Sequence, residues 1–171
     1  MAKKKKYKEC LTTPFETGIR NFTEVAKYFL YYAPNIDSAQ SVGAIEGERA
    51  ENLFSALMVQ SSLHNKYKVL KKIQPASWKG LDFDNEELDF EDSRLLFDKY
   101  SNEDNLHALL RHVRNALAHG CLYVWRKKTG SYVFLVDFDS NKKRPTAKIM
   151  VSMPILEQWK ALIENEIATG E

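Results

Sequence analysis

Apolar side chains recur every three or four positions through much of the first 120 residues, a spacing typical of amphipathic helices. The spacing predicts a first helix that begins at Pro14, where a missing N–H is harmless, and ends before Pro34-Asn35. A second, longer helix is expected from about Ala44 to Lys72, with Gly43 and Gly47 leaving its first residue open. The first stripe contains Phe15, Ile19, Phe22, Ala26, Phe29 and Leu30, and the second contains Ala50, Leu53, Leu57, Leu63, Tyr67 and Leu70.

Residues 75–92 break the helical pattern and carry seven acidic residues after Gly80. A calcium-binding loop that begins at Asp82 requires glycine at its sixth position and glutamate at its twelfth, but Glu87 and Ser93 stand there. We therefore expect an exposed acidic loop at 75–92, followed by a short helix near 93–100.

The most clearly marked helix is expected at 103–119. Ser101 and Asp104 have the spacing of a capping box, and Gly120 stands where a helix C-cap is expected. The apolar stripe of this helix consists of Leu106, Leu109, Leu110, Val113 and Leu117.

After Gly120 the pattern becomes typical of strands, with two runs rich in β-branched and aromatic residues joined by a hairpin turn at 128–131. A third strand follows the basic loop at 141–145, which gives a β unit at 121–152, and a last helix is expected at 154–168. The predicted fold is mainly α: an up-and-down bundle of four to five helices with a small antiparallel β unit of two or three strands and a C-terminal helix.

Composition adds bounds to this picture. A length of 171 residues predicts one domain, which we place at 14–171 after a basic tail at 1–13. A net charge of +2 is too small for binding nucleic acid by charge alone. Two cysteines cannot form a disulfide scaffold, and no apolar segment follows Lys3–Lys6 as a signal peptide requires. No apolar run approaches the ~20 residues of a membrane span. We expect a reduced, soluble protein of the cytoplasm with no membrane partner.

Charge and imidazole concentrate in the segment from Arg111 to Gly120, because three of the four histidines lie in the predicted helix 103–119. At roughly 100° per residue, Arg114 flanks the apolar stripe and Asn115 lies opposite the core. His112 and His119 are then expected on the outward face, about 10 Å apart along the axis, too far to share one metal ion.

Arg114 and His119 are separated by about 140° on an ideal helix, so an intact helix brings both to one phosphate only with difficulty. Two arrangements solve this problem. Either the helix unwinds near Gly120 and the imidazole swings back, or two copies of the chain face each other across a two-fold axis. The second arrangement also gives the polar face of the helix a use.

The segment Arg114-Asn115-Ala116-Leu117-Ala118-His119 resembles the R-x4-6-H signature of the HEPN superfamily, in which a polar residue commonly follows the arginine. The resemblance implies a metal-independent endoribonuclease that needs no cofactor and acts as a homodimer on tRNA or another structured RNA, as a toxin or phage-defence effector. An antitoxin or regulatory protein is then a further expected partner.

The resemblance also assigns roles to individual residues. His119 transfers a proton to or from the reacting oxygens, and Arg114 stabilises the charged phosphate. Asn115 orients one of these two side chains. Because the attacking group is the ribose 2′-hydroxyl, RNA but not DNA is the expected substrate. The substrate contacts expected around this site are Arg111, His112, Lys142, Lys143 and Arg144.

Two other functions remain open on the sequence. The same polar face suits a non-catalytic module that binds RNA, a nucleotide or a partner protein without cleaving it. The acidic stretch at 82–92 also suits an interaction protein that binds a basic partner. With either function, Arg114 forms an ion pair with an acid of that stretch, and His119 complements the dipole at the C-terminus of the helix.

Overall fold

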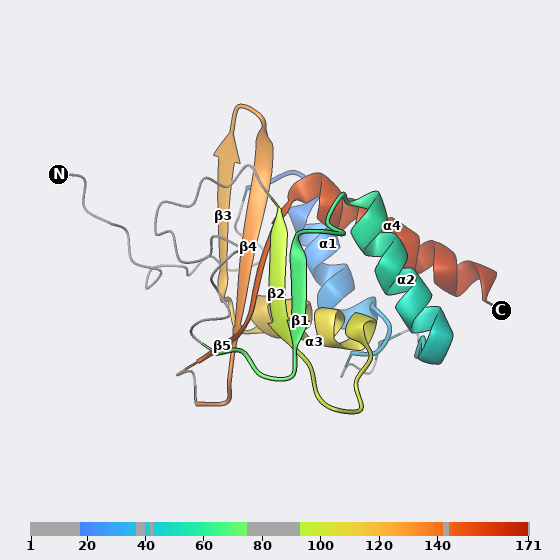
Figure 1. Cartoon of the computed structure of the whole chain (residues 1–171). Coiled ribbons are helices and arrows are strands. Elements are labelled where there is room, and N and C mark those ends of the chain that lie inside the picture. The colour runs from blue at the N-terminus through green and yellow to red at the C-terminus, as the bar shows by residue number, and fades with distance from the viewer. Residues whose placement is uncertain (1–17, 37–39, 42, 75–92, 142–143, 171) are drawn as a thin grey trace.

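A computed structural model describes residues 18–36, 40–41, 43–74, 93–141 and 144–170. The predicted basic tail at 1–13, the acidic loop at 75–92, Lys142 and Lys143 lie outside the described residues. Within them, the chain forms four α-helices and a five-stranded mixed sheet, with the helices packed against one face of the sheet (Figure 1). The predicted helical bundle with a small β unit is therefore wrong, because the sheet is a full layer of the fold.

The sheet has the strand order β1-β2-β5-β4-β3. Strands β1 (Tyr67–Leu70) and β2 (Arg94–Asp98) are parallel to each other, whereas β3 (Leu122–Lys127), β4 (Gly130–Phe138) and β5 (Pro145–Ser152) form antiparallel pairs. Strand β5 also pairs with β2 in antiparallel fashion. The predicted hairpin and third strand thus belong to a larger sheet, which two further strands from the earlier part of the chain complete.

Both additional strands lie where the sequence predicted helices. Strand β2 occupies the predicted short helix at 93–100, and β1 occupies the end of the predicted helix at 44–72. The residues Leu95, Leu96 and Phe97 are all buried, so β2 is covered on both faces and shows no alternation of apolar and polar residues. A short apolar run of this kind does not distinguish a buried strand from a turn of helix.

The first two helices are shorter than their apolar stripes predicted. Helix α1 (Phe22–Lys27) begins after Asn21, whose backbone is left-handed, and continues as a π-helical turn, η2 (Tyr28–Tyr32). Helix α2 (Gly47–Gln60) ends before Ser62, another residue with a positive φ, and α4 (Met153–Thr169) matches the predicted last helix. The stripes extend further than the helices because residues beyond the helix ends also pack into the core.

Helix α3 (Asn105–Ala118) is capped at both ends by its own sequence. Asp104, not Ser101, is the N-cap, and its carboxylate accepts a hydrogen bond of 2.7 Å from the backbone N–H of His107. At the other end, Gly120 has a φ of 64°, and the N–H groups of Gly120 and Cys121 bond the carbonyls of Leu117 and Ala116. These two bonds form a Schellman motif, which requires a left-handed residue at position 120.

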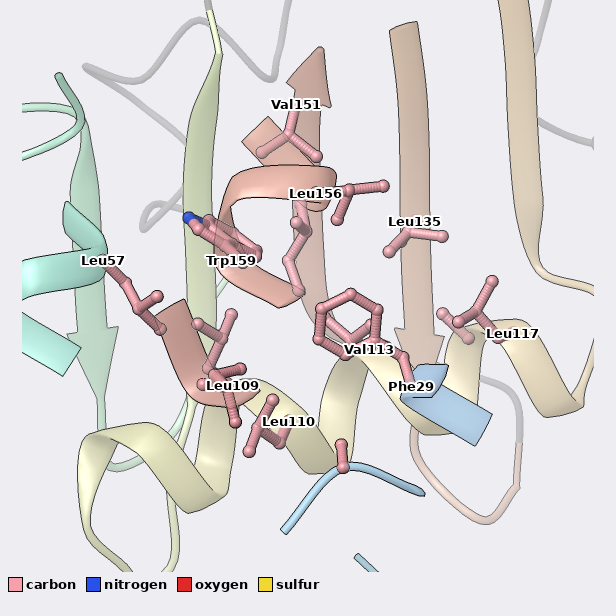
Figure 2. Packing of buried hydrophobic residues seen from close by; sticks show 14 of the residues in the cluster. Phe29, Leu57, Leu109, Leu110, Val113, Leu117, Leu135, Val151, Leu156 and Trp159 are labelled. Atoms are coloured by element: carbon pink, nitrogen blue, oxygen red, sulfur yellow. The ribbon is translucent and has the colours of Figure 1, made fainter. Parts of the chain in front are cut away.

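The main core lies between the helices and the sheet (Figure 2). Trp159 of α4 is fully buried there, and its indole N–H donates a 2.8 Å hydrogen bond to the hydroxyl of Ser61. A smaller apolar cluster lies on the other face of the sheet and comprises Ile73, Leu96, Phe134, Val136 and Met150. None of the described helices is long and apolar enough to cross a membrane.

Strands β2 and β4 run in the same direction, because each is antiparallel to β5 between them. Phe97 and Asp137 pair with the same residue of β5, Ala147, so the two strands end at the same edge of the sheet. Asp98 and Asp137 therefore lie at that edge with one strand between them. Helix α3 packs against β2, β4 and β5 and brings its polar residues to these two aspartates.

Candidate active site

His112 is the centre of a buried polar network at this sheet edge. Its Nδ1 lies 2.7 Å from Oδ2 of Asp137, and its Nε2 lies 2.7 Å from the backbone oxygen and 3.5 Å from the carboxylate Oδ1 of Asp98. The side chain has no exposed surface. His112 was predicted to point outward, and this prediction is wrong. The polar face of α3, on which His112 lies, is covered by the ends of β2 and β4.

The surroundings of His112 favour its charged form. Burial by itself disfavours an imidazolium, but the hydrogen bonds to Asp137 and Asp98 outweigh burial and raise the pKa of His112 above its usual value of 6.5. The nearby Arg111 guanidinium acts in the opposite direction. In the imidazolium both ring nitrogens are donors, which matches acceptors on both sides of the ring.

Asn115 lies one helical turn beyond His112 and joins this network to Arg114. Its amide nitrogen donates to Oδ2 of Asp137 at 3.3 Å, and its Oδ1 accepts from Nη1 of Arg114 at 3.3 Å. The two contacts require opposite ends of the amide, so together they specify its orientation. Asn115 was expected to face away from the core, but it faces the end of β4.

Arg111, on the same helix, forms a second, partly buried ion pair. Its Nε and Nη2 donate to the carboxylate oxygens of Glu103 at 2.7 and 2.8 Å, and its guanidinium lies 4.3 Å from the ring centroid of Tyr100. Burial raises the pKa of Glu103, but hydrogen bonds from Arg111 and from the Tyr100 N–H outweigh burial and lower the pKa. Arg111, which we predicted as a substrate contact, thus has its guanidinium engaged inside the protein.

His119 is exposed and occupies the C-cap of α3. Its backbone N–H still donates to the Asn115 carbonyl at 3.0 Å, so the hydrogen-bond ladder of the helix continues up to this residue. The helix therefore does not unwind before His119, and the first of the two arrangements considered above is not the one observed. His119 follows Asn115 by four positions and lies on the same side of α3 as Asn115 and His112.

Arg144 lies just before β5, at the sheet edge where Asp98 and Asp137 are found. Its guanidinium donates to the Ile73 carbonyl at 3.0 Å and lies 3.9 and 4.0 Å from the carboxylates of Asp98 and Asp139. About a third of the side chain remains exposed. Of the three substrate contacts predicted in the basic loop, Arg144 is therefore the one that the structure describes. It lies beside the network on α3.

Sequence reasoning did not single out Asp98 or Asp137. Asp137 follows Val133 and Leu135 on the inward face of β4, and an acid on a buried face needs a polar partner. Asp98 likewise ends an apolar run. An acidic residue at the end of a buried strand was therefore the signal that could have identified both aspartates. Their partner His112 was instead predicted on the outward face of the helix.

The described residues contain no group of three or more histidine, cysteine, aspartate or glutamate side chains placed to hold a metal ion. The site instead combines an exposed imidazole, a guanidinium on the same helix and an amide between them. A guanidinium offers donors arranged to bind a phosphate, and an imidazole exchanges protons near neutral pH. These are groups that suit general acid–base chemistry on a phosphodiester.

Comparison with known proteins gave one assignment. A family model described as HEPN pEK499 p136 matches residues 16–166, which includes α3 and the whole sheet. The comparisons with curated proteins and with solved structures gave no match to the chain.

Proposed function

The chain belongs to the HEPN pEK499 p136 family, and from this membership and the site on α3 we propose that it is a metal-independent endoribonuclease. One observation carries the proposal. The Arg114 guanidinium donates to the side-chain oxygen of Asn115, and the exposed His119 follows Asn115 by one turn of the same helix.

The proposed reaction is an attack within the RNA strand. The ribose 2′-oxygen forms a bond to the adjacent phosphorus, and the bond from phosphorus to the 5′-oxygen breaks. His119 accepts the 2′-hydroxyl proton or donates a proton to the leaving 5′-oxygen, and the Arg114 guanidinium stabilises the negative charge on the pentacoordinate phosphate. The products carry a 2′,3′-cyclic phosphate and a 5′-hydroxyl, and DNA is not a substrate.

We further propose that two copies of the chain form the complete site. His119 remains in the helical hydrogen-bond ladder, so its angular separation from Arg114 of about 140° persists within one copy. A two-fold axis near the C-terminal end of α3 brings Arg114 of each copy toward His119 of the other. Release of such an activity in a cell destroys RNA, which suits a toxin or phage-defence effector kept in check by an antitoxin.

The test is cleavage of total RNA by the purified protein in the presence of EDTA. We expect discrete fragments ending in 2′,3′-cyclic phosphates, and a loss of cleavage of about a hundredfold or more in Arg114→Ala and in His119→Ala. The matched controls are Arg20→Ala and His64→Ala, which change exposed residues of the same types far from α3 in sequence. Both controls should cleave as the unchanged protein does.

Two results would refute the proposal. Cleavage that persists in both Arg114→Ala and His119→Ala assigns the activity to other residues or to a contaminant. RNA that binds to the unchanged protein but stays intact identifies a non-catalytic binding module instead. Mixing the two inactive variants tests the shared site, because a composite dimer regains partial activity from heterodimers that keep one intact Arg–His pair.

A further inference from the structure

We infer that His112 and Asp137 are positioning residues, which hold Asn115 and through it the Arg114 guanidinium in place for the reaction. This inference rests on the proposed function for its catalytic consequence but not for its geometry. It concerns two buried residues that the R-x4-H signature does not include.

The contacts form a continuous chain from the sheet to the guanidinium. Asp98 holds the Nε2 side of the His112 ring, and Asp137 holds the Nδ1 side at 2.7 Å. Oδ2 of Asp137 also accepts from the Asn115 amide, and Asn115 in turn accepts from Arg114. Each group thus limits the rotation of the next one along the chain.

Asp137 itself has little freedom to move. Its Oδ1 accepts a 2.9 Å hydrogen bond from the backbone N–H of Phe138, while its Oδ2 accepts from two side chains. The residue is buried at the end of a strand that is paired on both sides. A carboxylate held in this way is a rigid anchor, whereas Asn115 and Arg114 belong to a partly exposed helix face.

The anchor also explains why the amide at position 115 is useful. A side-chain amide accepts at one end and donates at the other. Asn115 therefore links the anionic Asp137 to the cationic Arg114 through two hydrogen bonds, although it carries no charge itself. A displacement of a reacting group by about 1 Å costs up to about a hundredfold in rate. The anchor therefore contributes to the rate without contacting the substrate.

The first test needs no RNA. In nitrogen-15-labelled protein, NMR resolves the side-chain amide of Asn115 and the guanidinium of Arg114, which are assigned by their loss in Asn115→Ala and Arg114→Ala. We expect Asp137→Asn to shift both signals, because the carboxylate that orients the amide is removed. The control Ser61→Ala removes a buried hydrogen bond to Trp159 elsewhere in the core and should leave both signals unchanged.

The second test is a double-mutant cycle on the single-turnover cleavage rate. Asp137→Asn and Asn115→Ala should lower the rate by similar factors, of about ten- to a hundredfold. The double variant should be no slower than the slower single variant, because both changes break the same chain. Ser61→Ala should leave the cleavage rate unchanged at temperatures where the protein is folded.

The outcomes separate the two proposals. Unchanged Asn115 and Arg114 signals in Asp137→Asn overturn the positioning role, whether or not the protein cleaves RNA. Rate losses that multiply in the double variant overturn it as well, because they show independent effects such as partial unfolding. Shifted signals in a protein that never cleaves RNA support the chain of contacts and refute the endoribonuclease.

Discussion

The buried imidazole predicts an unusual dependence of stability on pH. Hydrogen bonds to Asp137 and Asp98 raise the pKa of His112 in the folded protein above its value of about 6.5 in the unfolded chain. Between these two pKa values the folded state binds one proton more than the unfolded state, so the free energy of unfolding falls as the pH rises. The stabilisation is fully present below pH ~6.5 and is lost as the pH passes the pKa of the folded state.

One proton sets an upper limit to the slope of about 1.4 kcal/mol per pH unit. A change of that size moves the melting temperature of a domain of 150–250 residues by roughly 3–5 °C. The assay is urea denaturation between pH 6 and 9 of the unchanged protein and of His112→Gln, whose amide does not titrate in this range. Taking the difference between the two slopes removes the contribution of every other ionisable group.

We expect the unchanged protein to lose stability more steeply with rising pH than His112→Gln does. Parallel curves would refute the reasoning, because they would show that His112 has the same pKa in the folded protein as in the unfolded chain. A lower stability of His112→Gln at every pH does not bear on this question, since the comparison concerns slopes. The groups that surround the ring are Asp137, Asp98 and Arg111, and none of them changes in the variant.

Two further changes test the packing and capping of α3. Leu109 is fully buried in the main core (Figure 2), so Leu109→Ala leaves a cavity there. The free energy of unfolding, measured in urea, should fall by about 2–5 kcal/mol. A loss well below ~1 kcal/mol would contradict this packing. Gly120→Ala places a β-carbon on a left-handed backbone with no atom within 4 Å of it, so its cost of about 1–2 kcal/mol comes from the backbone alone. An unchanged melting temperature in Gly120→Ala would show that the Schellman motif does not contribute to stability.

The residues that define α3 could be recognised in the sequence, because their signals are local. The apolar stripe from Leu106 to Leu117 is buried as predicted, and Gly120 has the left-handed backbone expected after a helix. The β-hairpin after α3 was also predicted, since alternation and a turn sequence act over a few residues. The R-x4-H segment led to the HEPN superfamily, and the family match confirms that assignment.

The additional strands were not recognised because their identity depends on distant partners. Strand β2 has neighbours from residues 67–70 and 145–152, and both of its faces are buried. Four or five residues with such burial show neither the period of a helix nor that of an exposed strand. Strand β1 is only partly buried, but its apolar residues continue the stripe of α2 although the helix has ended.

The sequence by itself determined which residues of α3 share a face, where the helix ends and which family the chain resembles. Only the tertiary structure decided that the polar face of α3 meets the edge of the sheet instead of solvent. Helical periodicity gives the angle of a side chain around its own axis, but it contains no information about how many sides of the helix other elements cover. His112 is therefore a buried partner of Asp137 and Asp98, although its sequence position suggested an exposed residue.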